Sequence, residues 1–250
     1  MPSHLSDIGF DLRSQEDFEQ LAVKTCNQGQ RFRTTDGTYI KWSLGLGIEL
    51  WAQLDQHDEI IDLHPYFRGN ARMRVNIVNE IKRPNSTILD AAYYGWANPS
   101  DDGMENGDFP FVFDVPNYKI QAPRMGSVAV VQLAAFAHEL ESYSSIEEFD
   151  RSQGEGFGGY ASKSFIPSGL FTPEGEDTVP PEAYAIFAGH VLETSLIRNP
   201  VTATDFCWAH VSTYGGEVDV VADPVLLNNV VVKGGVVKGS FWLSGVVIES

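Results

Sequence analysis

The side chains that could bind or transform a ligand are spread along the chain rather than gathered in one motif. Trp42, Trp51 and Trp96 could line a pocket between strands, and His64 lies just before Pro65 at the end of a strand-like segment. Indole rings and a few polar groups are typical of pocket walls, so these three tryptophans and His64 are predicted to form a ligand site. The alternative is that the tryptophans belong to the core and His64 satisfies a nearby carbonyl.

The sequence motifs of known reactions are not met. His138-Glu139-Leu140-Glu141 lacks the second histidine of the zinc-binding HExxH helix. Gly154 to Gly159 matches G-x-G-x-x-G in letters, but no strand precedes it, no helix follows it, and Glu155 would repel a phosphate. The acidic loop from Asp101 to Asp108 offers oxygen ligands without the spacing of an EF-hand. No P-loop, G-x-S-x-G turn or cysteine cluster is present, so no motif defines a reaction.

The charge balance bears on the class of partner. The 250 residues include 17 basic and 34 acidic side chains, a formal net charge of −17. Such a surface repels nucleic acid and anionic membranes, because binding a polyanion requires basic groups that displace counterions. The surplus of carboxylates either serves only solubility or receives a basic partner protein.

The compartment is expected to be the cytoplasm. The first residues, Met1 to Asp7, have no basic segment followed by an apolar run, and no apolar stretch approaches the roughly 18 residues that cross a bilayer. Cys26 and Cys207 lie far apart, on the apolar face of a predicted helix and of a predicted strand. Two buried free thiols fit a reducing compartment.

The first quarter of the chain predicts a strand, a helix and then a meander of strands. Ser14 has the type and position of a helix N-cap, and Gly29 marks the end of that helix. Asp36-Gly37 is a strong hairpin signal between two of the later strands. The predicted order therefore begins βαβββ, with a strand over residues 5–12, a helix over 15–27 and strands over 31–35, 38–44 and 47–54. A further strand over 59–63 continues the meander.

The remaining sequence predicts further strands, which makes the fold class α+β and mostly β. Strands are expected over residues 72–82, 111–114 and 128–140. The segment from Ser145 to Asp150 echoes the capped helix start at Ser14, so 128–177 could be a degenerate second unit. A Gly-, Pro- and Ser-rich stretch then predicts a boundary near residue 178. The last part predicts a small antiparallel, OB-like β-barrel, with strands over 184–192, 206–214, 217–222, 230–232 and 241–248. It carries three basic and seven acidic side chains, which argues against an oligonucleotide ligand.

The βαβββ order over residues 3 to 63 resembles the repeating unit of the vicinal-oxygen-chelate (glyoxalase-like) superfamily. Proteins of that family commonly bind a divalent metal through a histidine on the first strand and a glutamate on a later strand. The resemblance implies His4 and Glu49 as metal ligands, with the ion polarising a substrate oxygen. In the second unit His138 and Glu139 are the nearest candidates, without a clear match. The chain as a whole also resembles bacterial proteins, which implies no activity.

Two functions follow as hypotheses. The leading one is a non-enzymatic binding or protein-interaction module with no cofactor, which binds a basic protein or a small molecule. The alternative is a metal-dependent glyoxalase-like enzyme or small-molecule binder that uses His4 and Glu49. The first hypothesis rests on the acidic composition and on the missing catalytic motifs.

Overall fold

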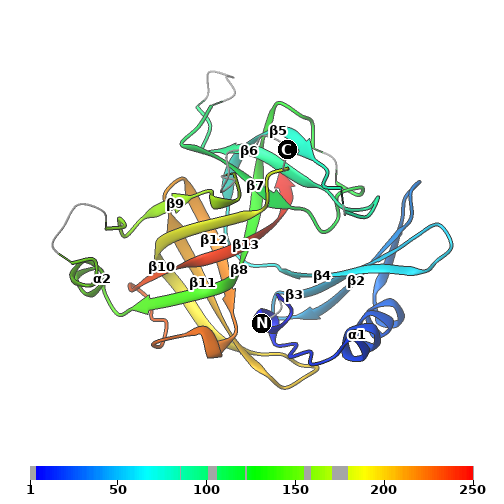
Figure 1. Ribbon diagram of the computed structural model, residues 1–250, viewed down its shortest axis with the longest axis horizontal. Coiled ribbons are helices and arrows are strands. Elements are labelled where there is room, and N and C mark those ends of the chain that lie inside the picture. The colour runs from blue at the N-terminus through cyan, green and yellow to red at the C-terminus, as the bar shows by residue number, and fades with distance from the viewer. Residues whose placement is uncertain are drawn as a thin grey trace.

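A computed structural model describes residues 4–84, 86–100, 106–121, 123–154, 159–170 and 180–249. Over these residues the chain is mostly β, with two sheets and few helical segments, which confirms the α+β class (Figure 1). No helix in this part of the chain combines the length and the apolar composition needed to cross a bilayer.

The strand predicted over residues 5–12 is not formed. The chain makes a 3-10 turn at Ser6–Ile8, and Gly9 then adopts a left-handed conformation at φ 84°. The side chains of Asn199 and Thr202 donate hydrogen bonds to the carbonyls of Ile8 and Gly9, at 2.8 and 2.6 Å. These distant side chains occupy carbonyls that a strand would offer to a neighbour, so the segment docks as a turn.

The helix and the meander that follow are confirmed. Helix α1 (Gln15–Gln28) has Ser14 as its N-cap, and the Ser14 and Asp17 side chains form a reciprocal capping box. The small sheet has the antiparallel order β1-β2-β3-β4, with α1 packed against it (Figure 1). Its strands are β1 (Gln30–Arg33), β2 (Thr38–Gly45), β3 (Ile48–Leu54) and β4 (Ile60–Phe67).

The two faces of the small sheet differ in chemistry. One face meets α1, where Lys24 of the helix lies over the Trp42 ring. The opposite face is unusually polar, because alternate residues of β3 and β4 include Gln53, Asp62 and His64. This polar face is turned toward the large sheet, since Gln53 and His64 both hydrogen-bond Asp90, which precedes β6.

The large sheet has nine strands in the order β11-β12-β8-β5-β6-β7-β13-β10-β9. The stretch predicted as a strand over residues 128–140 is a strand, and Ser145 caps the short helix α2 (Ile146–Ser152) as predicted. Two further 3-10 turns are η2 (Ser168–Leu170) and η3 (Pro224–Leu226). The strands are β5 (Met73–Ile81), β6 (Ala92–Ala97), β7 (Phe109–Asp114), β8 (Ser127–Tyr143), β9 (Ser164–Ile166), β10 (Tyr184–Arg198), β11 (Asp205–Thr213), β12 (Gly216–Ala222) and β13 (Val236–Glu249).

The long strands β8 and β13 pair with each other and join two closed rings of strands. One ring contains β8, β13, β10, β11 and β12, and the other contains β8, β5, β6, β7 and β13. The pairing therefore does not follow the boundary predicted near residue 178, because strands from both sides of it share hydrogen bonds. The expected strand over 230–232 is absent, and β8 takes the fifth place in the first ring.

Of the second βαβββ unit predicted over 128–177, the described residues show only the first strand and the helix. Strand β8 is followed by α2, but the one strand described between α2 and residue 170 is β9, and β9 pairs with β10. The acidic loop residues 101–105, the segment 155–158 and the stretch 171–179 lie outside the described residues.

Candidate functional site

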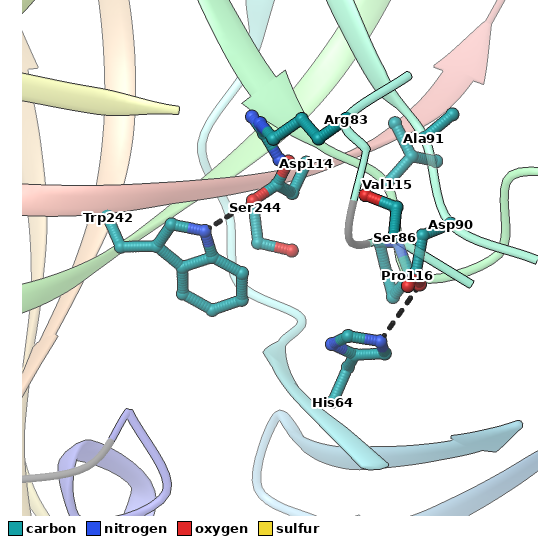
Figure 2. Close-up of a pocket in the computed structure, with 10 residues that line it drawn as sticks. All are labelled: His64, Arg83, Ser86, Asp90, Ala91, Asp114, Val115, Pro116, Trp242 and Ser244. Carbon is teal, nitrogen blue, oxygen red and sulfur yellow. Dashed lines mark hydrogen bonds and ion pairs between the residues drawn. The ribbon is translucent and has the colours of Figure 1, made fainter. Parts of the chain in front are cut away.

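A cavity of about 210 Å³ lies between strand β4 of the small sheet and the large sheet. Figure 2 shows its wall residues, with His64 on one side and the Arg83, Asp114 and Trp242 group facing it. The wall contains charged, hydroxyl, aromatic and aliphatic groups, namely His64, Arg83, Ser86, Asp90, Ala91, Asp114, Val115, Pro116, Trp242 and Ser244.

One wall is built around His64 and Asp90. The His64 Nε2 atom lies 3.0 Å from Asp90 Oδ1, and the Gln53 amide donates to the same oxygen at 2.5 Å. The Thr87 backbone N–H donates to the other carboxylate oxygen at 3.0 Å, and the Thr87 hydroxyl donates to the Gln53 carbonyl at 2.6 Å. His64, Gln53 and the Thr87 backbone therefore fix the Asp90 carboxylate, which is part of the cavity wall.

The charges on this wall follow from those contacts. Burial alone would lower the pKa of His64, but the hydrogen bond with Asp90 and the carboxylates of Asp62, Asp90 and Asp114 raise that pKa to about 9. Burial alone would raise the pKa of Asp90, but hydrogen bonds with His64, Gln53 and Thr87 lower it to about 2. At neutral pH the wall therefore carries an imidazolium beside a carboxylate.

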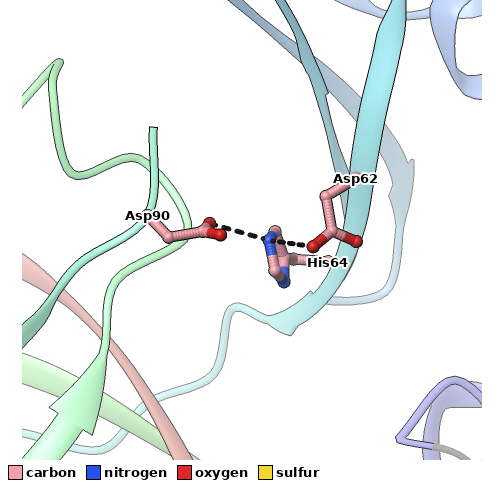
Figure 3. A group of neighbouring side chains, drawn as sticks. All are labelled: Asp62, His64 and Asp90. Carbon is pink, nitrogen blue, oxygen red and sulfur yellow. Dashed lines mark hydrogen bonds and ion pairs between the residues drawn. The ribbon is translucent and has the colours of Figure 1, made fainter. Parts of the chain in front are cut away.

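Asp62 adds a second carboxylate to the same imidazole. Asp62 and His64 are two residues apart on β4, so their side chains point to one face of the strand (Figure 3). The Asp62 Oδ2 atom lies 3.5 Å from His64 Nε2. One ligand atom from each of Asp62, His64 and Asp90 lies within 4.8 Å of the other two. Among the described residues, these three side chains are the group of at least three His, Cys, Asp or Glu whose ligand atoms lie this close together.

The opposite wall is built around Asp114 at the end of β7. Arg83 Nη1 lies 2.6 Å from Asp114 Oδ1, and the Trp242 indole N–H donates to Asp114 Oδ2 at 2.6 Å. The parallel pairing of Asp114 with Ser244 brings β7 and β13 together at this point. Arg83 also donates from Nε to the Pro181 carbonyl at 3.3 Å. The Arg83 Nη2 atom is buried and has no hydrogen-bond partner among the described residues. A buried donor without a partner lowers the stability of the fold, so its presence needs an explanation other than packing.

Of the four residues predicted to line a pocket, His64 does so and the three tryptophans do not. Trp51 is the cross-strand neighbour of His64, but its ring is buried against Phe32 and Tyr39. Trp42 lies on the α1 side of the small sheet, and Trp96 lies on β6 opposite Pro110. The tryptophan of the cavity is Trp242 on β13, which was not predicted to line a pocket.

His4 and Glu49, the metal ligands implied by the family resemblance, have separate partners. The Glu49 carboxylate is buried and lies 2.7 Å from Lys41 Nζ and 2.9 Å from Arg68 Nε, so its charge is neutralised by two cations. The His4 ring lies 4.4 Å from the Trp242 ring and 5.1 Å from that of His138. Burial, with His138 and His64 nearby, lowers the pKa of His4 to about 4. His4 is thus a neutral neighbour of the cavity that does not line it.

The other histidines of the sequence have local roles. His138 is exposed on β8, and its ring contacts those of His4 and Tyr184, whereas Glu139 is exposed and belongs to no donor group. His210 pairs with Glu217 at 3.0 Å across β11 and β12, and His190 hydrogen-bonds Ser162. Neither His190 nor His210 lines the cavity.

Sequence reasoning missed most of the cavity wall, although two signals were present. Asp114 closes the run Phe109 to Phe113 as a lone charge on an otherwise apolar strand. The pair Asp62 and His64 places two polar donors on one strand face at the spacing of a pleat. No sequence pattern near Asp62, His64 or Asp114 indicates that Arg83 or Trp242 lies close to them in the fold.

Comparison with protein-family models, with curated proteins and with solved structures finds no match for this chain. The cavity is therefore the feature of this chain from which a function can be inferred.

Proposed function

We propose that this chain is a non-enzymatic binding protein that takes a small, neutral, hydroxylated molecule into the cavity beside His64. The observation that carries the proposal is the presence of two ion pairs, His64–Asp90 and Arg83–Asp114, in the walls of one cavity. A cavity of about 210 Å³ is smaller than the sites of drug-sized ligands, so the molecule has the size of a single sugar ring or a short polyol.

The lining favours hydroxyl groups over a net charge. Its two cations and two carboxylates balance, so an ionic ligand gains no net attraction from the wall. A carboxylate offers about four lone-pair sites, and Asp114 uses two of them for Arg83 and Trp242. The remaining sites accept hydrogen bonds from ligand hydroxyls, while Trp242, Val115 and Pro116 suit C–H groups.

A binding role is favoured over catalysis by the hydroxyls of the wall. Ser86 and Ser244 line the cavity, but neither hydrogen-bonds His64 in the described structure, so no serine nucleophile is paired with a base. The glyoxalase-like alternative with His4 and Glu49 is not carried forward, because the partners of Glu49 account for its charge. The ring of β8, β13, β10, β11 and β12 has the strand number of an OB-like barrel, which supports a binding scaffold without naming a ligand.

The test is a panel of monosaccharides and polyols, measured by saturation-transfer NMR and by thermal shift in the presence of EDTA. We expect a subset to bind the wild-type protein and to bind Asp114→Asn at least tenfold more weakly, since the amide loses the ion pair with Arg83. Asp108→Asn is the matched control, because Asp108 is an exposed carboxylate that bonds Asn98 and does not line the cavity. Failure of every panel member at millimolar concentration, or equal binding by both variants, would overturn the proposal.

A metal-dependent enzyme is the second candidate, and one observation favours it. Asp62, His64 and Asp90 bring two carboxylates and an imidazole together at the edge of the cavity. Such a donor set could hold a Lewis acid next to a bound molecule.

A further inference from the structure

We infer that Asp62, His64 and Asp90 form a binding site for a first-row divalent cation at the edge of the cavity. The inference goes beyond the proposed small-molecule binding and does not depend on it, because the ion would be held by protein side chains alone. Four features support this site: the distances between the three donor atoms, the donor types, the groups that hold the donors in place and the cavity beside them.

The donor separations match those around a single ion. Zinc lies about 2.0–2.2 Å from nitrogen and oxygen ligands, so two ligands of one such ion lie roughly 3.0–3.5 Å apart. His64 Nε2 lies 3.0 Å from Asp90 Oδ1 and 3.5 Å from Asp62 Oδ2. The remaining separation, between the two carboxylates, is at most 4.8 Å, which a side-chain rotation can shorten.

The donor types define the class of cation. Imidazole suits zinc, iron, copper and nickel, whereas carboxylates suit magnesium, calcium and manganese. The mixture of one imidazole and two carboxylates therefore favours Mn²⁺, Fe²⁺ or Zn²⁺. Because only a neutral imidazole can bind an ion, the cation must displace the proton that His64 otherwise carries beside the two carboxylates. Thiolate-seeking ions are disfavoured, since Cys26 and Cys207 are not part of the group.

The donors are held in place by surrounding groups, as metal ligands commonly are. Gln53 and the Thr87 backbone fix the Asp90 carboxylate, and the Thr87 hydroxyl fixes the Gln53 amide. The Leu63 backbone N–H donates to Asp62 Oδ1 at 2.7 Å, which leaves the Oδ2 atom directed at His64. Two of the ligands also come from one strand, which limits their relative movement.

The cavity is an independent observation that points to a ligand at this position. His64 and Asp90 both line it, so an ion bound to them would have coordination positions open to water or to a ligand oxygen. The pair His210–Glu217 provides a contrast. Its nitrogen and oxygen are also 3.0 Å apart, but it lacks a second carboxylate and does not line the cavity.

The experiment titrates EDTA-treated, desalted full-length protein with Mn²⁺, followed by electron paramagnetic resonance, and with Zn²⁺, followed by calorimetry, at physiological salt. We expect one saturable site per chain. Asp62→Asn keeps the acceptor for Leu63 and should weaken binding at least tenfold. Glu217→Gln, which removes the carboxylate from the contrasting pair, should bind like the wild type. Absence of saturable binding at millimolar metal, or equal weakening in the two variants, would overturn the inference.

A second measurement keeps the test independent of how the variants fold. In the wild-type protein, Mn²⁺ bound at this site broadens NMR signals according to their distance from the ion. We expect the signals of residues 62–64 and 90 to broaden first and those of residues 210 and 217 to persist. Broadening that is uniform over the acidic surface, or centred elsewhere, would show that the ion does not occupy this site.

Discussion

Gly69 lies directly against the carboxylate of Asp219. A β-carbon at position 69 would come within 2.2 Å of the Asp219 Cγ and Oδ1 atoms. Asp219 is fully buried and accepts hydrogen bonds from the Asn70 and Ala71 backbone and from the Trp208 indole. The link between the small and the large sheet is therefore held by a carboxylate on β12, and it needs glycine at position 69.

Gly69→Ala is expected to destabilise the protein by about 1–3 kcal/mol, the cost typical of overpacking a filled site. Asp219 cannot move aside without losing hydrogen bonds to buried donors. The measurement is the free energy of unfolding in urea. Gly159→Ala is the control, because the nearest atoms there belong to the Gln153 side chain at the end of α2. Equal effects of the two substitutions would contradict the role given to the Gly69–Asp219 contact.

Asp7 makes the stability dependent on pH. Burial raises the pKa of Asp7 from 3.8 to about 8, although the Asp223 backbone N–H donates to its carboxyl. Between about pH 4 and pH 8 the folded protein keeps a proton on Asp7 that the unfolded chain releases. The stability contributed by Asp7 is therefore complete below pH 4, falls as the pH rises, and is lost above pH 8.

Asp7→Asn isolates this effect, since the amide keeps an acceptor for Asp223 and does not titrate. Relative to the wild type, the variant should gain at least about 1 kcal/mol of unfolding free energy between pH 5 and pH 8, against an upper limit of about 1.4 kcal/mol per pH unit. Urea denaturation of both proteins at the two pH values gives the difference. Parallel losses in wild type and variant would mean that Asp7 is already ionised at neutral pH in the folded protein.

The start of α1 offers a local prediction. The Ser14 hydroxyl accepts from the Asp17 N–H at 3.1 Å, and the Asp17 carboxylate accepts from the Ser14 N–H at 3.0 Å. Ser14→Ala should lower the free energy of unfolding by about 1 kcal/mol, because the Asp17 N–H loses its partner. Ser14→Asp, which restores a cap, should recover most of that loss. An unchanged urea midpoint in Ser14→Ala would show that α1 does not depend on its cap.

Local signals in the sequence predicted much of the secondary structure. The caps at Ser14 and Ser145 and the hairpin at Asp36-Gly37 each depend on residues a few positions apart, and each is found in the structure. The prediction of a strand over residues 5–12 was wrong because carbonyls of this segment accept hydrogen bonds from Asn199 and Thr202, which no local pattern reveals. For the same reason the sequence did not reveal that strands on the two sides of the boundary predicted near residue 178 pair, since β8 and β13 are distant in sequence yet pair along most of their length.

The cavity was less predictable than the fold. Its charged groups come from β4, the segment after β5, the segment before β6 and the end of β7. Only their packing brings His64, Arg83 and Asp114 together. The sequence did predict that His64 lines a pocket, and His64 is one of the wall residues of this cavity. The acidic surplus of the chain is not explained by this cavity, and association with a basic protein stays a prediction.

A buried polar network next to Gly69 carries a cooperative prediction. The Tyr66 hydroxyl contacts the backbone and side-chain carbonyls of Gln132, the former at 3.0 Å. The Gln132 amide donates to Asp219 Oδ2 at 2.9 Å, and the Trp208 indole donates to Asp219 Oδ1 at 2.9 Å. Tyr66 on the small sheet and Trp208 on the large sheet are therefore joined through two shared side chains.

Tyr66→Phe and Trp208→Phe should each destabilise the protein by about 1–3 kcal/mol, because each removes one hydrogen-bond donor from a buried acceptor. Their combined effect should differ from the sum by at least about 0.5 kcal/mol, since the first substitution already loosens the network that the second would disrupt. Urea unfolding of the two single variants and the double variant gives the coupling energy. Tyr143→Phe replaces Tyr66→Phe in a control cycle, because Tyr143 contacts Glu141 and has no part in the network. Additive effects in the Tyr66–Trp208 cycle would show that each sheet stabilises its own end of the network independently.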